Sequence, residues 1–345
     1  MKPTLTTREQ KILWATVERY IATAEPVGSR VLSQEYKLDI STATIRHVLN
    51  ALDRSGLLIQ PHTSAGRVPS DFGYRVYVDE LLPEPKPELV ESVKQALSKI
   101  HPDRYGNLHS ILRRVSQILA SLSGCVAMVT SPNMQIMRIK SIQLLTVDAD
   151  KLMVIVMGDS LHTSSSIVTL PEAMVGENLE QELDILQNFL NYHLQGKPWV
   201  ELSNLPWAEL DQQFQAYGLL LDKCLQQLAH IPLVNEQIFI SGLSELLRQP
   251  EFQQPQQVQG VIYILESEQA CLLPLLNANT GGVQIGAEMG VDYLHNCALV
   301  SSPYYCDRQP VGTVGVLNAT RMNYAKSIAC VETAANHLTE VVSQW

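Results

Sequence analysis

Polar and apolar side chains alternate at helical spacing between residues 41 and 56. At about 100° per residue, one side of such a helix is polar or small, and it holds Ala43, His47, Asn50 and Arg54, with Arg46 on its flank. The opposite side is apolar and must face a core; it holds Ile45, Val48, Leu49 and Leu52. Hydrogen-bond donors, an amide and a methyl group can read base edges in the DNA major groove and contact phosphates. The pattern therefore predicts a DNA-recognition helix, and the alternative is an ordinary solvated helix face.

The preceding residues predict the elements that position this helix. Thr6-Thr7-Arg8-Glu9 fits a capping box that starts a first helix, and Ala24-Glu25-Pro26 ends it. Residues 29–36 are typical of a short second helix, and residues 37–40 of a tight turn. Ser41 then fits the N-cap of the third helix, which Gly56 ends. Two helices joined by a tight turn, the second polar on its outer side, form a helix-turn-helix.

A predicted hairpin follows the recognition helix directly. Residues 57–60 and 67–69 fit two short strands, with the loop Pro61-His62-Thr63-Ser64-Ala65-Gly66 between them. A hairpin in this position is a wing, whose polar tip can reach the DNA backbone or the minor groove. The residues expected to do so are His62, Thr63, Ser64 and Arg67. The alternative is a plain polar turn.

Composition and charge distribution limit where nucleic acid could bind. The 345-residue chain predicts two or three domains, and 46% hydrophobic residues against 17% charged ones allow sizeable cores. The formal net charge is −10. Residues 1–75 nevertheless hold ten Lys and Arg against seven Asp and Glu, whereas residues 76–345 hold fifteen against twenty-eight. Only the N-terminal segment could present a basic face to phosphates.

Several classes of protein are disfavoured. No apolar run approaches the ~18 residues that span a bilayer, and the first residues contain no apolar signal region, so neither membrane insertion nor secretion is expected. The six cysteines lie far apart and form no C-x-x-C pair. We therefore expect buried free thiols in a cytoplasmic protein, with no metal site and no cofactor.

Breaks in composition indicate the domain organisation. Three prolines within residues 83–87 predict an extended linker, and the Gln-rich stretch 249–260 predicts a surface connection. Helices are expected at about 88–100, 107–122, 177–194, 207–230 and 321–342. Strands are expected at Cys125–Thr130, Ile139–Val147, Leu152–Met157, Val261–Leu265, Val283–Ile285, Ala298–Ser302 and Gly312–Leu317. This order indicates a mixed sheet domain that a mostly helical insertion interrupts.

Several motifs resemble one family. Glu25-Pro26-Val27-Gly28-Ser29-Arg30, Ala43-Thr44-Ile45-Arg46 and the run from Gln60 to Pro69 are similar to the winged-helix signatures of the heat-inducible transcription repressor HrcA family. Gly312-Thr313-Val314-Gly315-Val316 and Thr320-Arg321-Met322 resemble its C-terminal pattern, so the similarity extends over nearly the whole chain. His47 departs from the asparagine usual there, which could alter operator discrimination.

The resemblance implies an α+β, multidomain fold. It comprises a winged helix-turn-helix domain at 1–82, a linker at 83–87, a GAF-like α/β domain at 88–171 and 259–345, and an inserted dimerisation domain at 172–258. It implies a repressor of chaperone operons that binds double-stranded DNA, an inverted repeat called CIRCE, as a homodimer, with the GroE chaperonin as modulator. The helices at 177–194 and 207–230 are candidates for the dimer interface or for internal packing only. The residues expected to contact DNA are Ser29, Arg30, Ser41, Thr42, Ala43, Thr44, Arg46, His47, Asn50, Arg54, His62, Thr63, Ser64 and Arg67.

Two other functions are weighed against a repressor. A ligand-sensing regulator could border a pocket with Asn279-Thr280-Gly281-Gly282 and Gly312-x-x-Gly315, although glycines at strand ends are usually turns. An enzyme could use His295-Asn296-Cys297 as a thiol–imidazole pair. No phosphate-binding loop, H-E-x-x-H helix or G-x-S-x-G elbow is present, so no catalytic activity is expected.

Overall fold

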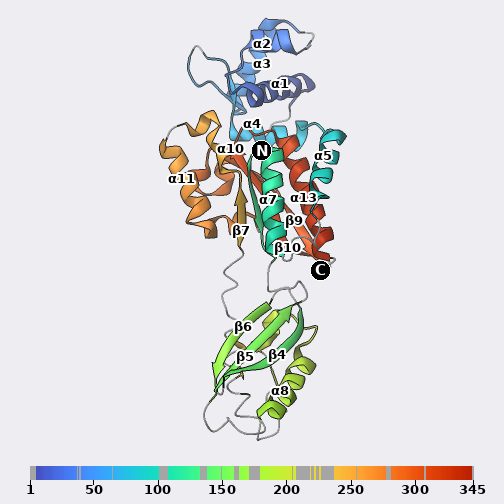
Figure 1. The fold of residues 1–345 in the computed structure, drawn as a ribbon. Coiled ribbons are helices and arrows are strands. Elements are labelled where there is room, and N and C mark those ends of the chain that lie inside the picture. Colours follow the sequence, from blue (N-terminus) through green and yellow to red (C-terminus); the bar gives the residue numbers. More distant parts are fainter. Residues whose placement is uncertain are drawn as a thin grey trace.

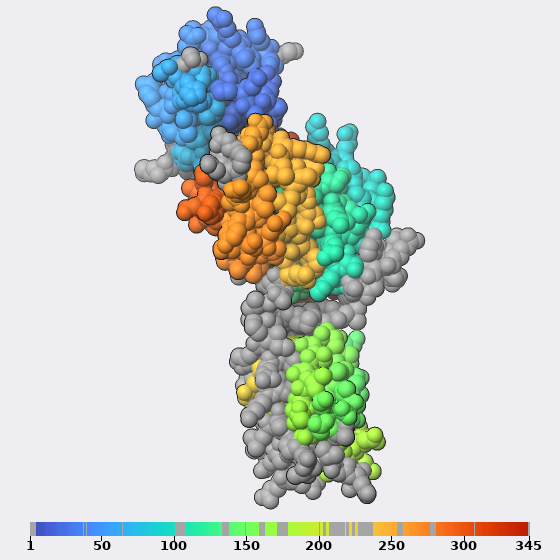
Figure 2. Space-filling view, turned by 60° about the vertical axis from the view of Figure 1, so that its left-hand side comes forward, coloured from blue at the N-terminus to red at the C-terminus, as the bar shows by residue number. Residues whose placement is uncertain are grey.

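Three units follow one another along an elongated molecule (Figure 1). This computed structural model describes residues 5–36, 38, 40–63, 65–100, 108–132, 138–148, 150–158, 163–170, 179–203, 205–206, 218, 221–222, 225–226, 237–253, 255–276, 281–306 and 308–343. A small unit with α-helices lies at one end, a unit built on a five-stranded sheet lies in the middle, and a three-stranded sheet with a helix packed on it lies at the far end (Figure 1). The space-filling view shows the same order of the three units (Figure 2).

The first unit contains three helices and a two-stranded sheet. They are α1 (Thr7–Thr23), α2 (Ser29–Glu35), α3 (Thr42–Arg54), β1 (Leu58–Ile59) and β2 (Val68–Pro69), with β1 and β2 antiparallel. The predicted capping box is confirmed, because the Glu9 amide donates to Thr6 Oγ1 at 3.3 Å and the Thr6 amide donates to Glu9 Oε2 at 2.9 Å. Ala24 ends α1 in the left-handed conformation, with φ 57°. Local capping and periodicity thus produce the predicted helices.

A short connection joins this unit to the central one. It consists of α4 (Asp71–Val76), the π-helical turn η1 (Tyr77–Leu81) and the proline segment before α5 (Pro87–Leu97). The backbone is extended at Leu82 and Lys86, and Pro87 begins α5, a position where proline is favoured. The extended stretch is therefore brief, and helices enclose it on both sides.

The central unit has three layers. Its antiparallel sheet has the order β7-β3-β10-β9-β8. The strands are β3 (Val126–Thr130), β7 (Ile238–Ser241), β8 (Gly282–Ile285), β9 (Cys297–Cys306) and β10 (Gln309–Ala319). Ala127 and Val129 pack with α7 (Leu108–Ser123) and α13 (Tyr324–Ser343), whereas Val126 and Met128 pack on the other face with α11 (Pro255–Glu266). Both faces are covered, which explains the continuous apolar run of β3.

Short elements complete the covering of the second face and the sheet edge. They are α10 (Leu243–Leu247), η7 (Pro250–Phe252), η8 (Gln269–Cys271), α12 (Leu273–Leu276), η9 (Gly286–Met289) and η10 (Asp292–Leu294). Leu246, Phe252, Leu276 and Leu294 from these elements are buried in one cluster with α11.

The third unit is a separate antiparallel sheet. Its order is β4 (Ile139–Asp148), β5 (Lys151–Gly158) and β6 (Thr163–Thr169), and α8 (Leu179–Leu194) packs on one face, followed by η4 (Trp199–Ser203). The leucines that predicted α8 are all buried, as expected. Asn191 fastens α8 to the sheet edge, because its side chain accepts from the Ile142 amide and donates to the Ile142 carbonyl, both at 2.8 Å.

Strand pairing divides the chain differently from the expected boundaries at 172 and 258. β5 pairs with β4 and with β6, whereas β7, which was not expected, pairs with β3 in the central sheet. The inserted segment therefore leaves the central sheet after β3 and returns at β7. It contains the three-stranded sheet as well as α8, so the strands expected at Ile139–Val147 and Leu152–Met157 belong to the insertion. The composition of a strand does not specify which sheet it joins.

The strand predicted at Val261–Leu265 is wrong, because these residues lie in helix α11. Val261, Ile264 and Leu265 are buried at helical spacing, whereas Tyr263 between them is 49% exposed. The Gln-rich stretch 249–260 is not a simple surface connection either, since it contains η7 and the first half of α11. A short apolar run cannot by itself distinguish a strand from a buried helix segment.

Some predictions lie wholly or partly outside the described residues. Most of the helix expected at 207–230 does, and its described residues Leu221 and Leu225 are buried in the cluster of α8. Among the described residues, no helix is long and apolar enough to cross a membrane, and no group of three or more potential metal ligands was found. The described cysteines are free; Cys125, Cys297 and Cys330 are buried, but Cys271 is exposed, contrary to expectation.

Candidate nucleic-acid interface

The first turn of α3 is fixed by its N-cap. Ser41 Oγ accepts a hydrogen bond from the Thr44 amide at 3.1 Å, which confirms Ser41 as the predicted cap. The Ser41 and Thr44 hydroxyls also lie 2.9 Å apart. Thr42 and Thr44 are half-buried. Three of the residues expected to contact DNA therefore form the start of the helix, where amide groups point outward.

The two sides of α3 match the prediction. Ile45, Val48, Leu49 and Leu52 are buried in the core that α3 shares with α1 and α2. The exposed side holds Ala43, Arg46, His47, Asn50 and Arg54. Arg54 Nε donates to the Asn50 carbonyl at 3.2 Å, one turn earlier in the helix. The helix thus presents one methyl, one amide, one imidazole and two guanidinium groups to the outside.

The hairpin after α3 is held close to the unit's own backbone. Arg67 and Val27 exchange two backbone hydrogen bonds of 2.8 and 2.9 Å. A Cβ at Gly66 would lie 2.5 Å from the Val27 carbonyl carbon, so only glycine fits there. At the tip, Gln60 Nε2 donates to the carbonyls of Thr63 and Ala65 at 3.0 and 3.1 Å. His62 and Thr63 are exposed on this braced loop, and Ser64 lies outside the described residues.

Two expected DNA contacts are otherwise engaged. Arg67, expected to reach the DNA backbone or the minor groove, instead pairs with Asp53, with 2.9 Å between Nε and Oδ2, and its Nη2 donates to Asn50 Oδ1 at 2.8 Å. Its side chain is only 13% exposed. Ser29, the first residue of α2, is 8% exposed and faces the core, whereas the neighbouring Arg30 is exposed. Motif position therefore did not reveal which side chains face outward.

Sequence reasoning also missed residues that shape this surface. Asp53 sits between the polar and apolar sides of α3, and Gln60 precedes the wing loop. Asp53 follows Asn50 by three positions and could have been noted as a neighbour on the helix. Its partner Arg67 comes from the hairpin, and nothing in the helix spacing indicates that pairing.

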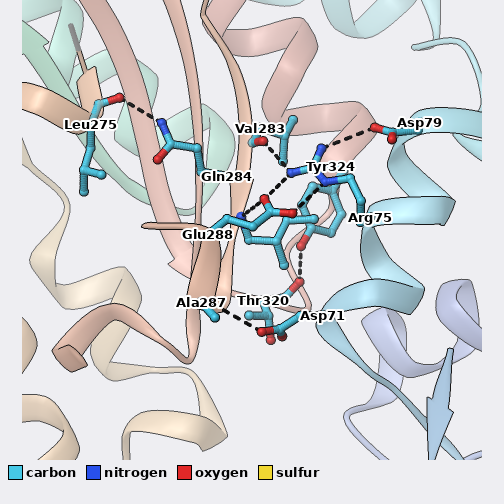
Figure 3. Close-up of polar contacts among 11 residues, drawn as sticks. Asp71, Arg75, Asp79, Leu275, Val283, Gln284, Ala287, Glu288, Thr320 and Tyr324 are labelled. Atoms are coloured by element: carbon cyan, nitrogen blue, oxygen red, sulfur yellow. Dashed lines mark hydrogen bonds and ion pairs between the residues drawn. The ribbon is translucent and has the colours of Figure 1, made fainter. Parts of the chain in front are cut away.

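A junction ties this unit to the central sheet (Figure 3). Arg75 of α4 donates through Nε to Glu288 Oε1 at 2.9 Å and through Nη2 to the Val283 carbonyl at 2.6 Å. The hydrogen bond with Glu288 raises the pKa of Arg75 above its usual value. Nearby, Asp71 Oδ2 accepts from the Ala287 amide at 3.3 Å, and a Cβ at Gly286 would lie 2.1 Å from that carboxylate oxygen.

Arg321 makes a second set of contacts across the same junction. Its Nε donates to Glu251 Oε1 at 2.5 Å, its Nη2 to Gln249 Oε1 at 2.8 Å, and its Nη1 to the carbonyl of Ile21 near the end of α1 at 3.2 Å. The Tyr77 hydroxyl also donates to Glu18 of α1. Arg321 of the Thr320-Arg321-Met322 motif thus connects α1 to the central unit.

Two of the glycines proposed to border a ligand pocket, Gly312 and Gly315, are packed against side chains. A Cβ at Gly312 would lie 2.4 Å from the Tyr304 hydroxyl, and one at Gly315 would lie 2.8 Å from Leu276 Cδ2. Tyr304 itself is buried and donates to the Thr130 carbonyl at 2.8 Å. These glycines therefore accommodate neighbouring side chains; Asn279 and Thr280 lie outside the described residues.

The proposed thiol–imidazole pair has the wrong environment. Cys297 is 0% exposed, and burial raises the pKa of its thiol to about 12. His295 is exposed, and its Nδ1 lies against the Asp292 carbonyl. A thiol that stays protonated is a poor nucleophile. This arrangement does not support thiolate chemistry.

Comparisons with known proteins agree with the sequence motifs. The family model described as HrcA protein C terminal domain matches residues 109–328. The heat-inducible transcription repressor HrcA of Trichormus variabilis is 43% identical over 366 aligned positions, covering 99% of this chain and all of the relative. The protein of the same name from Cyanothece sp. is 44% identical, with both chains covered completely. A solved structure, described as a hypothetical protein at 2.2 Å resolution, has a TM-score of 0.63, 23% identity and 99% coverage of both chains, which supports the fold.

The names of these relatives define a class, that of transcription repressors. Within that class, the chain belongs to the heat-inducible transcription repressor HrcA family.

Proposed function

We propose that the chain represses heat-shock chaperone operons in the cytoplasm by binding the CIRCE inverted repeat as a homodimer. In this proposal the first unit is a winged helix-turn-helix, α3 enters the major groove, and the hairpin tip contacts the backbone or minor groove. The central unit is the GAF-like domain, and the inserted segment between β3 and β7 provides dimerisation. The family name supports heat-shock genes as the target, and the exposure of the residues named above supports their contact with DNA.

One observation carries the proposal, namely the exposed polar side of α3. His47 and Asn50 are exposed on a helix whose opposite side is fully occupied by core packing. Arg30 and Arg46 form no ion pair within the described part of the chain, so both guanidinium groups remain available for phosphates or guanine edges. The capped start of α3 adds outward-pointing amides. The remaining expected contacts, at the hairpin tip, complete a two-part DNA surface.

The direct test is a titration of a palindromic duplex and a scrambled duplex with the full-length protein at several salt concentrations. We expect preference for the palindrome and an association constant that falls by ~0.9 log unit per log unit of salt for each neutralised phosphate. Arg46→Ala should weaken binding, while Lys151→Ala on the distant β5 should leave it unchanged. Equal affinity for the two duplexes would contradict the proposal.

Dimerisation is proposed because one recognition helix reads only a few base pairs, whereas a two-fold dimer matches a palindrome. The inserted unit offers an apolar surface for it. Leu145, Met153 and Ile167 are in register across β4, β5 and β6 on the sheet face away from α8. Ile167→Asp should shift the sedimentation coefficient toward that of a monomer, whereas Lys140→Asp should not. If Ile167→Asp leaves the dimer unchanged, the dimer interface does not lie on this sheet face.

Modulation by the GroE chaperonin is the part of the proposal that rests only on the family resemblance. A repressor that depends on chaperonin for its binding-competent state would lose operator affinity when heat diverts chaperonin to unfolded proteins. Operator titrations with and without added chaperonin test this step. We expect a larger active fraction of repressor with chaperonin, and an identical active fraction would contradict it.

A further inference from the structure

Both the backbone and the side chain of Arg67 are held by neighbouring residues. Its backbone is joined to Val27 by two hydrogen bonds, and its guanidinium meets two residues of α3. Nη2 donates to Asn50 Oδ1 at 2.8 Å, and Nε lies 2.9 Å from Asp53 Oδ2. The fork of the guanidinium therefore links the base of the hairpin to the exposed side of the helix.

This contact determines the orientation of the Asn50 amide. The oxygen and nitrogen of an amide side chain are hard to distinguish by shape, but a guanidinium has only donors, so the amide atom beside it must be the oxygen. The Asn50 Nδ2 group then carries two N–H donors, and among the described residues it has no protein partner. Asn50 is exposed, so these donors are free for a ligand.

The charge of Arg67 is already compensated. Asp53 supplies one carboxylate at ion-pair distance, and the Arg67 side chain is only 13% exposed. Moving the guanidinium out to a phosphate would leave the Asp53 carboxylate uncompensated beside the negatively charged duplex. The pair is close to neutral as a unit, so it adds little to the general attraction for DNA.

We propose that Arg67 is a positioning residue for sequence recognition and does not neutralise a phosphate. It holds Asn50 so that Nδ2 donates to an acceptor on a base edge in the major groove, such as purine N7, guanine O6 or thymine O4. An asparagine free to use both amide atoms would instead form the bidentate contact that selects adenine. This inference rests on the proposed DNA-binding function and adds a specificity determinant to it.

The experiment measures base preference and salt dependence together. Wild-type protein, Asn50→Ala, Arg67→Ala, Arg67→Lys and the double variant Asn50→Ala/Arg67→Ala are titrated with a panel of single-base variants of the preferred palindrome. We expect Arg67→Ala to reduce discrimination about tenfold at the base pairs that Asn50→Ala affects, without changing the slope against salt. The double variant should match Asn50→Ala alone, because Arg67 acts through Asn50.

Arg67→Lys separates positioning from charge. Lysine keeps the positive charge but lacks the planar fork, so it should behave like Arg67→Ala if orientation is what matters. If Arg67→Lys keeps the base discrimination of the wild-type protein, the charge of Arg67 is what matters and the inference is wrong. The inference is also wrong if Arg67→Ala lowers the salt slope by ~0.9 and weakens binding to all sequences equally, because Arg67 is then a phosphate contact.

Asp53→Asn provides a second measurement that does not depend on removing Arg67. It leaves the guanidinium uncompensated, so we expect stronger binding to any duplex and a steeper salt slope. An unchanged slope would contradict the neutral-pair argument. Circular dichroism melts identify any variant that fails to fold. If wild-type protein shows no preference for a palindrome, the proposed function itself fails, and this outcome is distinct from the others.

Discussion

Arginines on the outer side of α3 and arginines at the junction with the central unit have opposite environments. Arg46 and Arg54 are exposed on the helix. Arg75 and Arg321 have side chains only 22% and 13% exposed. Carboxylates and carbonyls surround both guanidinium groups, and Figure 3 shows those around Arg75. The same residue type therefore serves two purposes: an exposed guanidinium is available to an external anion, whereas an enclosed one fixes how two parts of the chain lie.

The difference explains how a chain with net charge −10 can both bind DNA, as proposed, and hold its DNA-binding unit in a defined orientation. Enclosed arginines are already matched by carboxylates, so they add little attraction for phosphate. Removing an exposed arginine should change DNA affinity with little loss of stability. Removing an enclosed arginine should lower stability with little change in DNA affinity. The predictions below test that separation.

The largest expected effect is on the junction. Arg321→Ala should lower the free energy of unfolding by about 3 kcal/mol, because Glu251 would be left without its ion-pair partner. Glu251 Oε2 is already buried with no hydrogen-bond partner within the described residues, so the remaining carboxylate would be poorly compensated. Denaturant titration followed by circular dichroism measures the change.

Arg248→Ala is the matched control for this variant. Arg248 pairs with Glu245 on the same stretch of chain, but its side chain is 73% exposed. An exposed pair of this kind contributes about 0.5 kcal/mol. Similar losses for Arg248→Ala and Arg321→Ala would mean that enclosure is not what makes the junction arginine important.

An intermediate effect is expected at alkaline pH. Burial raises the pKa of Tyr74, Tyr77 and Tyr324, all at the junction, above the usual value of 10.0. Below pH 10 these phenols are protonated in both the folded and unfolded chain. As the pH rises above that value, the unfolded chain loses protons that the folded chain keeps, so stability falls by about 1.4 kcal/mol per pH unit for each phenol.

Tyr74→Phe isolates one of these protons. The Tyr74 hydroxyl is buried with no hydrogen-bond partner within the described residues, so phenylalanine should be tolerated at neutral pH. The variant should then lose less stability than wild type between neutral pH and pH 11. Equal losses in the two proteins would show that Tyr74 does not stay protonated in the folded state.

The same comparison shows what the sequence can and cannot reveal. The capping box of α1, the 3.6-residue period of α3 and the leucine spacing of α8 are local, so their elements were predicted correctly. The enclosed arginines depend on residues far away in the chain. Arg75 and Glu288 are 213 positions apart, and Arg321 and Ile21 are 300 apart. No local pattern marks such partners.

The errors have a similar origin. The prediction of a strand at Val261–Leu265 is wrong because five residues contain too little periodicity to distinguish a strand from a helix. The expected domain boundaries differ from the observed sheets because tertiary contacts decide which strands pair. At the candidate site, the exposure of His47 and Asn50 followed from helical spacing. The enclosure of Arg67 did not, because its partners are on α3, and Arg67 and Asn50 are 17 positions apart.

The smallest expected effect on stability is on the outer side of α3. His47 is exposed and has no role in the core, so His47→Ala should change the free energy of unfolding by less than about 0.5 kcal/mol. Its effect should be on DNA recognition, where losing a base-edge contact relaxes preference at one position of each half-site. Selection of bound sequences from random duplexes, alongside a denaturant melt, measures both. A large loss of stability with an unchanged preferred sequence would place His47 among the structural residues. The distinction between the exposed and the enclosed surfaces would then fail at His47, where α3 should show it most clearly.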